Sequence, residues 1–358
     1  MGVFGFLKKD KTASSAKKGF HQLAIANIEK LSNDTVRVTF DVPSELKKVF
    51  SFKAGQYLNF LLEINGEEIR RSYSICSGEN EALAVAVKAI KNGIASNWFN
   101  SVAAVNDLLF VAAPEGNFIL PANAKTVVAF AAGSGITPIV SLAKALQNNQ
   151  GQMQLFYGNR SLENTLFKTD FENLSAVTTQ YFFSQEQNEG AIAGRIDKET
   201  ITNCIKADLA LLKADAFFIC GPEEMILAVV STLEFFGVAK NKIHYELFTT
   251  PVLMKKEETV ESNFKGTSAV KVILDSEVAE FSLANEGKTI LEALEKAGLD
   301  APFSCRGGVC CSCKAKVLKG SASMKMNYSL TDEEVKDGYI LTCQAHPTSE
   351  ELIVSFDE

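Results

Sequence analysis

The sequence predicts a multidomain protein of mixed α+β and α/β class. Three patterns follow one another along the 358 residues: short strands with alternating apolar residues, then buried strands each followed by a helix, then a segment around a cysteine-rich loop. A chain of this length can form several domains with separate hydrophobic cores. We therefore expect a flexible tail at 1–19, domains at 20–120, 121–250 and 268–358, and a linker at 251–267.

The first domain is predicted to be a small antiparallel β-barrel. Alternating apolar residues indicate strands at 36–40, 58–62 and 83–87, a rhythm typical of barrels. The block Arg71-Ser72-Tyr73-Ser74 closes a further strand. Arginine can bind a diphosphate with two hydrogen bonds, tyrosine can stack on a flat ring, and serine can bond a ring nitrogen. In this context the block is a candidate flavin site.

A second part of the same site is expected at Gly93 to Asn97. Backbone N–H groups near a helix start, together with the Ser96 hydroxyl, can hold the diphosphate of the same cofactor. A plain turn at Gly93 with Ser96 as an N-cap residue is the alternative explanation.

The second domain is predicted to contain a parallel sheet, because buried strands at 126–132, 153–157 and 216–220 alternate with helices. The turn Gly133-Ser134-Gly135-Ile136-Thr137-Pro138 joins the first strand to its helix. Its glycines allow a dinucleotide to approach, and the helix N-terminus favours phosphates. Pro138 replaces the third glycine of the dinucleotide motif, and a glycine turn alone is weak evidence.

A second strand-to-helix turn, Cys220-Gly221-Pro222-Glu223-Glu224-Met225, is expected on the same sheet. Cys220 would lie there beside a nicotinamide ring, although a small buried residue is the ordinary explanation for such a cysteine. Glu246 is a candidate carboxylate near a flavin, and a surface strand glutamate is its alternative.

The third domain is predicted to combine a hairpin (270–274 and 278–283), a helix at 288–297 ended by Gly298, and a loop of cysteines. Cys305, Cys310 and Cys313 form a C-x4-C-x2-C run, and 29 residues separate Cys313 from Cys343. This spacing is typical of a plant-type [2Fe-2S] cluster. Cys311 is interpreted as a small buried residue. A structural zinc site or a disulfide framework are the competing interpretations.

Charge and composition limit the classes of molecule that this protein is expected to bind. The net charge is −7, and residues 268–358 hold 15 acidic against 9 basic side chains, a charge of −6. This charge argues against nucleic acid as a partner. An acidic face would steer an electron carrier to a basic surface on another protein, and a merely solvated face is the alternative.

The sequence has no run of 18 apolar residues, so no membrane span is predicted. Eight cysteines without a secretory signal indicate a cytoplasmic location and metal or redox use.

Taken together, these motifs resemble the ferredoxin-NADP reductase superfamily fused to a plant-type ferredoxin, and among its members the reductase subunits of bacterial phenylacetyl-CoA epoxidases. The resemblance covers Phe20 to Asp357. It implies an FAD-binding barrel, a doubly wound NAD(P)-binding domain and a β-grasp ferredoxin domain. The residues that it assigns to FAD are Arg71, Ser72, Tyr73, Ser74, Lys88, Gly93 and Ser96. Those that it assigns to NADPH or NADH are Gly133, Gly135, Thr137, Pro138, Arg160, Cys220, Gly221 and Pro222.

Ser74, Cys220 and Glu246 are the predicted catalytic residues, and Cys305, Cys310, Cys313 and Cys343 are the predicted cluster ligands. The same resemblance places Arg160 where a 2'-phosphate would be contacted, which favours NADPH. A salt bridge elsewhere is the alternative role for Arg160.

The chemistry then sets an order of carriers. A nicotinamide gives two electrons as hydride and a [2Fe-2S] cluster accepts one, so FAD must stand between them, and an external acceptor follows. The chain has three histidines and no Glu-x-x-His pair, so it cannot build a carboxylate-bridged di-iron centre. We expect a separate di-iron oxygenase as partner, that of phenylacetyl-CoA epoxidase first. The alternatives are a reductase for another aromatic or steroid hydroxylase, a redox sensor, and a flavin reductase with a zinc module.

Overall fold

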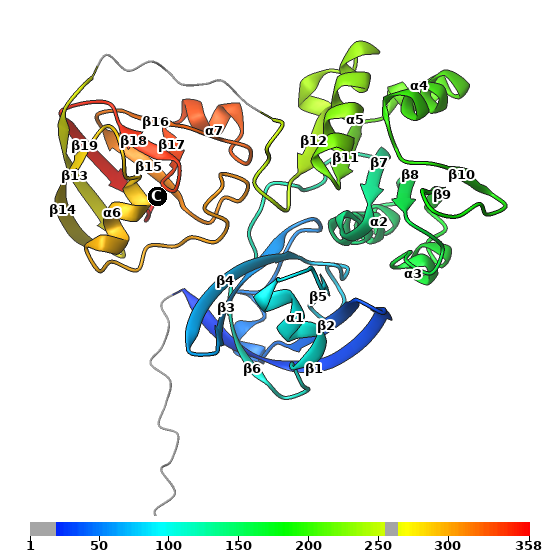
Figure 1. Cartoon of the computed structure of the whole chain (residues 1–358), viewed down its shortest axis with the longest axis horizontal. Coiled ribbons are helices and arrows are strands. Elements are labelled where there is room, and N and C mark those ends of the chain that lie inside the picture. Colours follow the sequence, from blue (N-terminus) through cyan, green and yellow to red (C-terminus); the bar gives the residue numbers. More distant parts are fainter. Residues whose placement is uncertain (1–18, 255–263) are drawn as a thin grey trace, which may run out of the picture.

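The computed structural model describes residues 19–254 and 264–358 and shows three lobes (Figure 1). The predicted fold class is confirmed: an antiparallel barrel, a parallel sheet with helices on both faces, and a small mixed domain. All of the predicted tail except Gly19, and the linker residues 255–263, lie outside the described residues. No helix in the described ranges is long and apolar enough to cross a membrane.

The barrel is a six-stranded antiparallel sheet in the order β4-β3-β6-β1-β2-β5. Its end strands β4 and β5 approach each other through a bridge between Ile75 and Val85, which closes the sheet. Helix α1 packs Phe99 edge-on against Phe60 of the barrel core. The bounds are β1 Phe20–Ser32, β2 Thr35–Asp41, β3 Tyr57–Ile64, β4 Glu67–Ser74, β5 Ala84–Lys88, β6 Leu108–Ala112, α1 Ile94–Ser101 and the 3-10 turn Ser44–Leu46.

The second domain has six parallel strands in the order β10-β9-β8-β7-β11-β12. The order reverses between β7 and β11, the position at which doubly wound sheets bind ligands. The strands are β7 Thr126–Ala132, β8 Gln152–Asn159, β9 Val177–Phe183, β10 Ala191–Ala193, β11 Ala216–Cys220 and β12 Ile243–Glu246. The helices are α2 Ile136–Asn148, α3 Lys168–Glu172, α4 Lys198–Ala207 and α5 Glu223–Phe235, with 3-10 turns at Gly133–Gly135, Leu209–Lys213 and Lys240–Lys242.

Alternation along the strands explains why helices cover both faces of this sheet. Ala129 and Phe218 belong to one hydrophobic core together with α2. Their neighbours Phe130 and Phe217 point the other way, into a second core with α4 and α5. Strands that are apolar on both faces must be covered twice, which gives the doubly wound arrangement.

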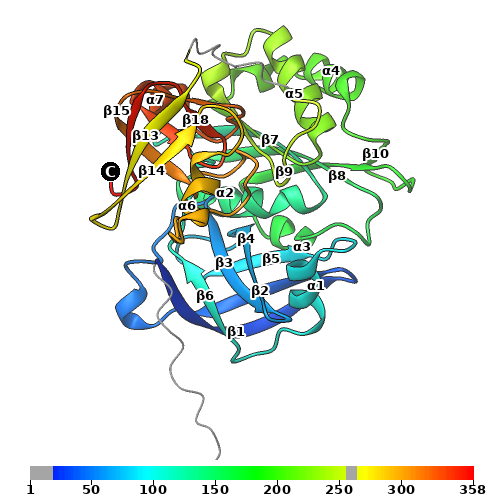
Figure 2. The same ribbon diagram turned by 60° about the vertical axis from the view of Figure 1, so that its left-hand side comes forward.

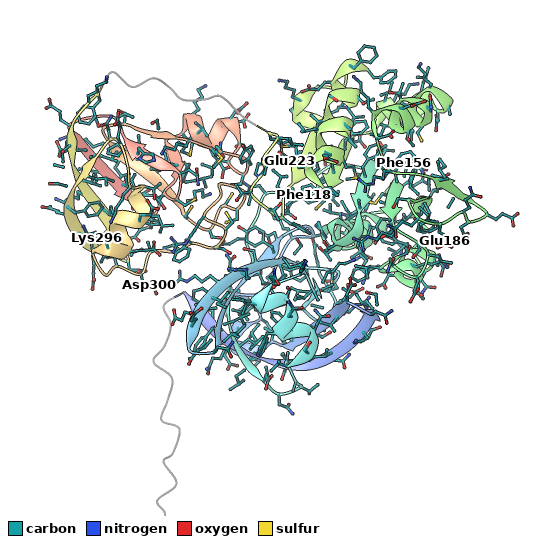
Figure 3. All side chains as sticks on the ribbon, in the orientation of Figure 1. Phe118, Phe156, Glu186, Glu223, Lys296 and Asp300 are labelled. Atoms are coloured by element: carbon teal, nitrogen blue, oxygen red, sulfur yellow. The ribbon has the colours of Figure 1, made fainter. Side chains whose placement is uncertain are left out.

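The barrel and the parallel-sheet domain share one core. Phe118, which follows β6, packs edge-on against Phe218 with ring centroids 5.0 Å apart, and it lies between the two lobes in Figure 3. At the rim, the Arg37 guanidinium donates to both oxygens of Asp170 at 3.0 and 2.8 Å. The two domains therefore form one packed unit.

The third domain contains a mixed five-stranded sheet in the order β14-β13-β19-β15-β17 and a two-stranded sheet of β16 and β18. The predicted helix at 288–297 is present as α6, which begins after a Thr289–Glu292 capping box and ends before Gly298 at φ +78°. The strands are β13 Thr267–Leu274, β14 Glu277–Ala284, β15 Lys314–Lys319, β16 Ala322–Met324, β17 Tyr339–Leu341, β18 Ala345–Pro347 and β19 Glu351–Ser355, and the helices are α6 Ile290–Lys296 and α7 Asp332–Lys336. Figure 2 shows α6 above β3 of the barrel.

Candidate redox site

Strand β4 carries the predicted flavin block on two faces. It pairs with β3 so that Ser72 lies opposite Asn59 and Tyr73 opposite Leu58. Tyr73 points to the side of Phe60 and Phe99, with ring centroids 5.8 and 5.5 Å away. Since side chains alternate along a strand, Arg71 shares the face of Tyr73, while Ser72 and Ser74 share the opposite face.

The face of Arg71 and Tyr73 fits a flavin nucleotide. The Arg71 side chain is exposed and donates to the Arg70 carbonyl oxygen at 2.7 Å, so its other donors can reach a phosphate. The eight-residue helix α1 begins after Gly93. A Cβ on Gly93 would meet the Ser96 Oγ at 2.4 Å and an Ile90 side-chain carbon at 2.5 Å, so any other residue at this turn would displace those side chains. The first backbone N–H groups of α1 have no hydrogen-bond partner within the helix and can bind a diphosphate.

Ser74, Glu246 and Cys220, the three predicted catalytic residues, come together across the barrel and the parallel-sheet domain. The Ser74 hydroxyl donates to the Glu246 carboxylate at 3.2 Å. Glu246 on β12 is the register partner of Cys220 on β11. One hydroxyl, one carboxyl and one thiol therefore line the junction between the flavin strand and the nucleotide sheet.

The environment of this trio changes its proton affinities. Desolvation raises the pKa of the Glu246 carboxyl to about 7, although the hydrogen bond from Ser74 opposes the rise. Burial, with a smaller contribution from Glu246, raises the pKa of the Cys220 thiol well above its usual range. Cys220 is thus a neutral thiol at physiological pH, whereas Glu246 can take up or release a proton there.

The two glycine turns of the parallel sheet meet at the reversal between β7 and β11. A Cβ on Gly135 would lie 2.1 Å from the Cys220 carbonyl oxygen, so only glycine allows the turns to touch. Gly133 has φ +54°, which favours glycine as well. The Thr137 hydroxyl donates to the Ser134 carbonyl oxygen at 3.1 Å and holds the start of α2. This geometry fits a dinucleotide at the helix N-terminus.

The remaining predicted residues lie at strand ends and helix starts of the two domains. Lys88 at the end of β5 has its Nζ 3.5 Å from an Asp34 oxygen. Pro138 is the third residue of α2, and Gly221 and Pro222 lead from Cys220 into α5. Arg160 follows β8 and is exposed, and its guanidinium makes no ion pair within the described residues.

The segment from Ser304 to Cys313, here called the cluster loop, holds three of the four predicted ligands. Arg306 and Gly308 have φ +54° and +73°, so the loop turns sharply between Cys305 and Cys310. The Gly307 N–H points at the Cys305 sulfur, 3.4 Å away. Gln344, next to the fourth ligand, donates to the Arg306 carbonyl oxygen at 2.8 Å and fixes the loop.

The four cysteines form two pairs. The sulfur atoms of Cys305 and Cys310 are 3.0 Å apart, and Cys313 and Cys343 form a second pair and shift each other's pKa. Two irons need two thiolates each, whereas a zinc ion gathers its ligands around one centre. The donor set therefore fits a two-iron cluster.

Each pair already favours a thiolate. The interaction with Cys310 lowers the pKa of Cys305 to about 6 and raises that of Cys310, and the interaction with Cys313 lowers the pKa of Cys343 and raises that of Cys313. The thiolate is the form that binds iron. Cys311 has a different environment, because burial raises the pKa of its thiol to about 11.

Several residues of the site were not predicted by any sequence motif. Tyr57 and Asn59 on β3 contact the cluster loop, and Glu115 bonds Asn59 at 3.0 Å. Glu223 accepts hydrogen bonds from three backbone N–H groups of 252–254. The one available signal was Asn59, a polar residue within the otherwise apolar start of strand 57–62.

Comparison with known families agrees with the three lobes. An oxidoreductase FAD-binding domain matches residues 22–119, an oxidoreductase NAD-binding domain matches 130–231, and a 2Fe-2S iron-sulfur cluster binding domain matches 272–348. The chain therefore contains binding domains for FAD, a nicotinamide nucleotide and a [2Fe-2S] cluster.

Similar proteins share this arrangement over nearly their full length. The chain is 36% identical to a subunit of the 1,2-phenylacetyl-CoA epoxidase of Escherichia coli (strain K12), over 94% of this chain and 98% of that protein. It is 28% identical to the ferredoxin reductase component of 3-ketosteroid-9-alpha-monooxygenase from Rhodococcus rhodochrous, over 93% and 96%. Phthalate dioxygenase reductase, a solved structure described as modular for electron transfer from pyridine nucleotides to [2Fe-2S], matches with a TM-score of 0.59 and 26% identity, over 94% and 98%.

The fold and the site define an iron–sulfur flavoprotein oxidoreductase that passes electrons from a nicotinamide nucleotide through FAD to a [2Fe-2S] cluster. The chain belongs to the ferredoxin-NADP reductase superfamily members that are fused to a C-terminal plant-type ferredoxin.

Replacing Glu246 with Gln should stabilise the protein increasingly as the pH rises. The folded-state pKa is raised from 4.5 to about 7, so deprotonation costs folded-state stability between these values, and the neutral amide avoids that cost. We expect the melting temperature of Glu246→Gln to exceed that of the wild type more at pH 8 than at pH 5. The exposed Glu224→Gln on the same domain is the control and should show a flat difference. A pH-independent difference for Glu246→Gln would contradict the raised pKa.

Proposed function

We propose that this protein is the reductase component of a multicomponent oxygenase, and that the oxygenase is a phenylacetyl-CoA epoxidase. The observation that carries the electron-transfer part is the contact between the cluster loop and the strands that bear the flavin block: Asn59 donates to Ser312 at 2.9 Å, and Ser72 lies 2.7 Å from Ser304. The last carrier is thereby adjacent to the flavin site. The identity of 36% over nearly the whole length with a protein of the epoxidase supports the choice of oxygenase.

In this proposal the residues divide into three groups. Arg71, Tyr73 and the start of α1 hold FAD, and the turns at Gly133 and Cys220 hold the nicotinamide nucleotide. Ser74 and Glu246 hold and move a proton where the two meet. When bound, FAD accepts a hydride and supplies single electrons to the cluster. The eight cysteines form no disulfides, which supports a reducing compartment such as the cytoplasm.

A steroid oxygenase is the second candidate for the acceptor. Relatives that are ferredoxin reductase components of 3-ketosteroid-9-alpha-monooxygenase share 28–30% identity over similar lengths. The deciding experiment supplies the purified reductase and NADPH to each purified oxygenase component. We expect phenylacetyl-CoA to be epoxidised at a rate that scales with reductase concentration. If only the ketosteroid is turned over, the steroid oxygenase becomes the proposed electron acceptor.

Replacing Cys343 with Ser should separate reduction of the flavin from electron transfer through the cluster. Loss of one ligand of the cluster should abolish cytochrome c reduction, while reduction of small two-electron acceptors continues from the intact flavin half. Steady-state assays with both acceptors measure this split. Cys311→Ser, which alters the cysteine outside the ligand spacing, is the matched control and should retain both activities. Equal loss of both activities in Cys343→Ser would contradict the order of carriers.

Replacing Arg160 with Ala should weaken the binding of NADPH more than the binding of NADH. The exposed guanidinium lies next to the nucleotide-binding edge of the sheet, where it can pair with a 2'-phosphate. We expect the KM for NADPH to rise roughly tenfold, the size of one charge-assisted hydrogen bond, with little change for NADH. The exposed Arg195→Ala is the control. Equal effects on both nucleotides would remove Arg160 from the phosphate site.

The acidic residues of α7 should guide docking of the acceptor. Asp332, Glu333 and Asp337 are exposed there, and exposed charges act over about 10 Å at 0.1 M salt. Neutralising all three should slow partner reduction at low salt and have little effect at high salt. Glu63→Gln with Glu67→Gln, on the barrel, is the control. An unchanged rate at low salt would leave this face without a docking role.

A further inference from the structure

Buried polar side chains join the cluster loop to the flavin barrel at two points. Near the first ligand, the Ser72 and Ser304 hydroxyl oxygens are 2.7 Å apart. Between the second and third ligands, Asn59 donates to the Ser312 hydroxyl at 2.9 Å. The backbone N–H of Cys311 donates to the Tyr57 hydroxyl at 3.2 Å. Both ends of the loop are therefore tied to strands β3 and β4.

Asn59 is the centre of this network. Its Nδ2 donates to both Ser312 and the Glu115 carboxylate, and its Oδ1 accepts from the Ser72 hydroxyl at 2.6 Å. The side chain thus uses both amide hydrogens and its oxygen, each on a different partner. Moving the loop would break the bonds of Ser312 to Asn59, Ser304 to Ser72 and Cys311 to Tyr57 together.

Burial makes such breakage costly. Asn59 is 4% exposed, Tyr57 6% and Ser312 7%. A buried polar group that loses its partner carries an uncompensated desolvation cost, which is larger than the net gain of an ordinary hydrogen bond. The network therefore favours one position of the cluster loop on the barrel, in addition to stabilising the contact between the two domains.

Contacts at the rim of the same interface have a different character. Arg70 forms an ion pair with Asp300, whose side chain is 59% exposed, and its guanidinium lies 4.5 Å from the Phe303 ring centroid. The Arg70 side chain is 9% exposed and also donates to the Ala301 carbonyl oxygen at 3.3 Å, whereas its Asp300 partner reaches solvent. Figure 3 shows Asp300 at the outer edge of this contact.

We propose that Asn59 and Tyr57 are positioning residues for electron transfer, because they fix the cluster loop relative to the flavin strand. They touch no reacting atom in this role. They set the separation and orientation of the two carriers, and these determine the rate of transfer inside the molecule. The inference goes beyond the proposed function, since it holds for any external acceptor.

The test compares Asn59→Leu, Ser312→Ala and their double variant with the rim variant Asp300→Asn in FAD- and cluster-loaded protein. Stopped-flow spectroscopy separates flavin reduction by NADPH from the later transfer to the cluster. Because a misplacement of about 1 Å between reacting groups can cost on the order of a hundredfold in rate, we expect transfer to the cluster to slow at least tenfold with flavin reduction unchanged. The double variant should be no slower than the slower single variant, since each single variant already removes the Asn59–Ser312 bond.

Backbone hydrogen exchange supplies a readout that does not depend on activity. Amides of 304–312 should exchange faster in Asn59→Leu and Ser312→Ala, and Tyr57→Phe should speed exchange at Cys311 in particular. Asp300→Asn should match the wild type in both measurements. If Asn59→Leu does not fold, Ser312→Ala tests the same bond from the other domain. Wild-type transfer and exchange in Ser312→Ala, or an equal effect of Asp300→Asn, would overturn the proposal.

Discussion

The two-residue period of strand β4 determines how the three domains meet. One face carries Arg71 and Tyr73 toward the barrel side that fits FAD. The opposite face carries Ser72 to the cluster loop and Ser74 to Glu246 of the nucleotide domain. Ser72 and Ser74 thus make contacts at two domain interfaces while the other face is left to the proposed FAD site, and a slip by one residue in this strand would exchange these contacts.

The nucleotide domain also reaches the cluster loop. Glu223, the first residue of α5, accepts hydrogen bonds from the backbone N–H groups of 252, 253 and 254 at 2.8, 2.6 and 2.5 Å, and it lies on the side of the ferredoxin domain in Figure 3. Met254 then accepts from the Tyr328 hydroxyl. A Cβ on Gly307 would meet the Thr250 hydroxyl at 1.9 Å, so the loop lies tightly against this segment. The cluster loop is the point where all three domains touch.

Sequence reasoning succeeded where chemistry is concentrated in short motifs. The cysteine spacing predicted the four residues that the fold brings together in two pairs, and the strand-turn-helix patterns predicted the glycine turns at Gly135 and Cys220. The convergence of Ser74 with Glu246 was not readable from spacing, because the two residues are 172 positions apart. Asn59 and Ser312 likewise belong to different domains, and only tertiary packing makes their hydrogen bond. Motifs thus predicted the cofactors, whereas the contacts that align them required the fold.

The most direct test of the relay is an anaerobic titration of the purified protein with NADPH, followed by visible and electron paramagnetic resonance spectra. The account predicts bleaching of the flavin and then a rhombic one-electron signal from a reduced [2Fe-2S] cluster. A flavin that bleaches with no cluster signal, in protein whose iron has been reconstituted, would contradict the central claim that this chain carries electrons from the nucleotide through FAD to its own cluster.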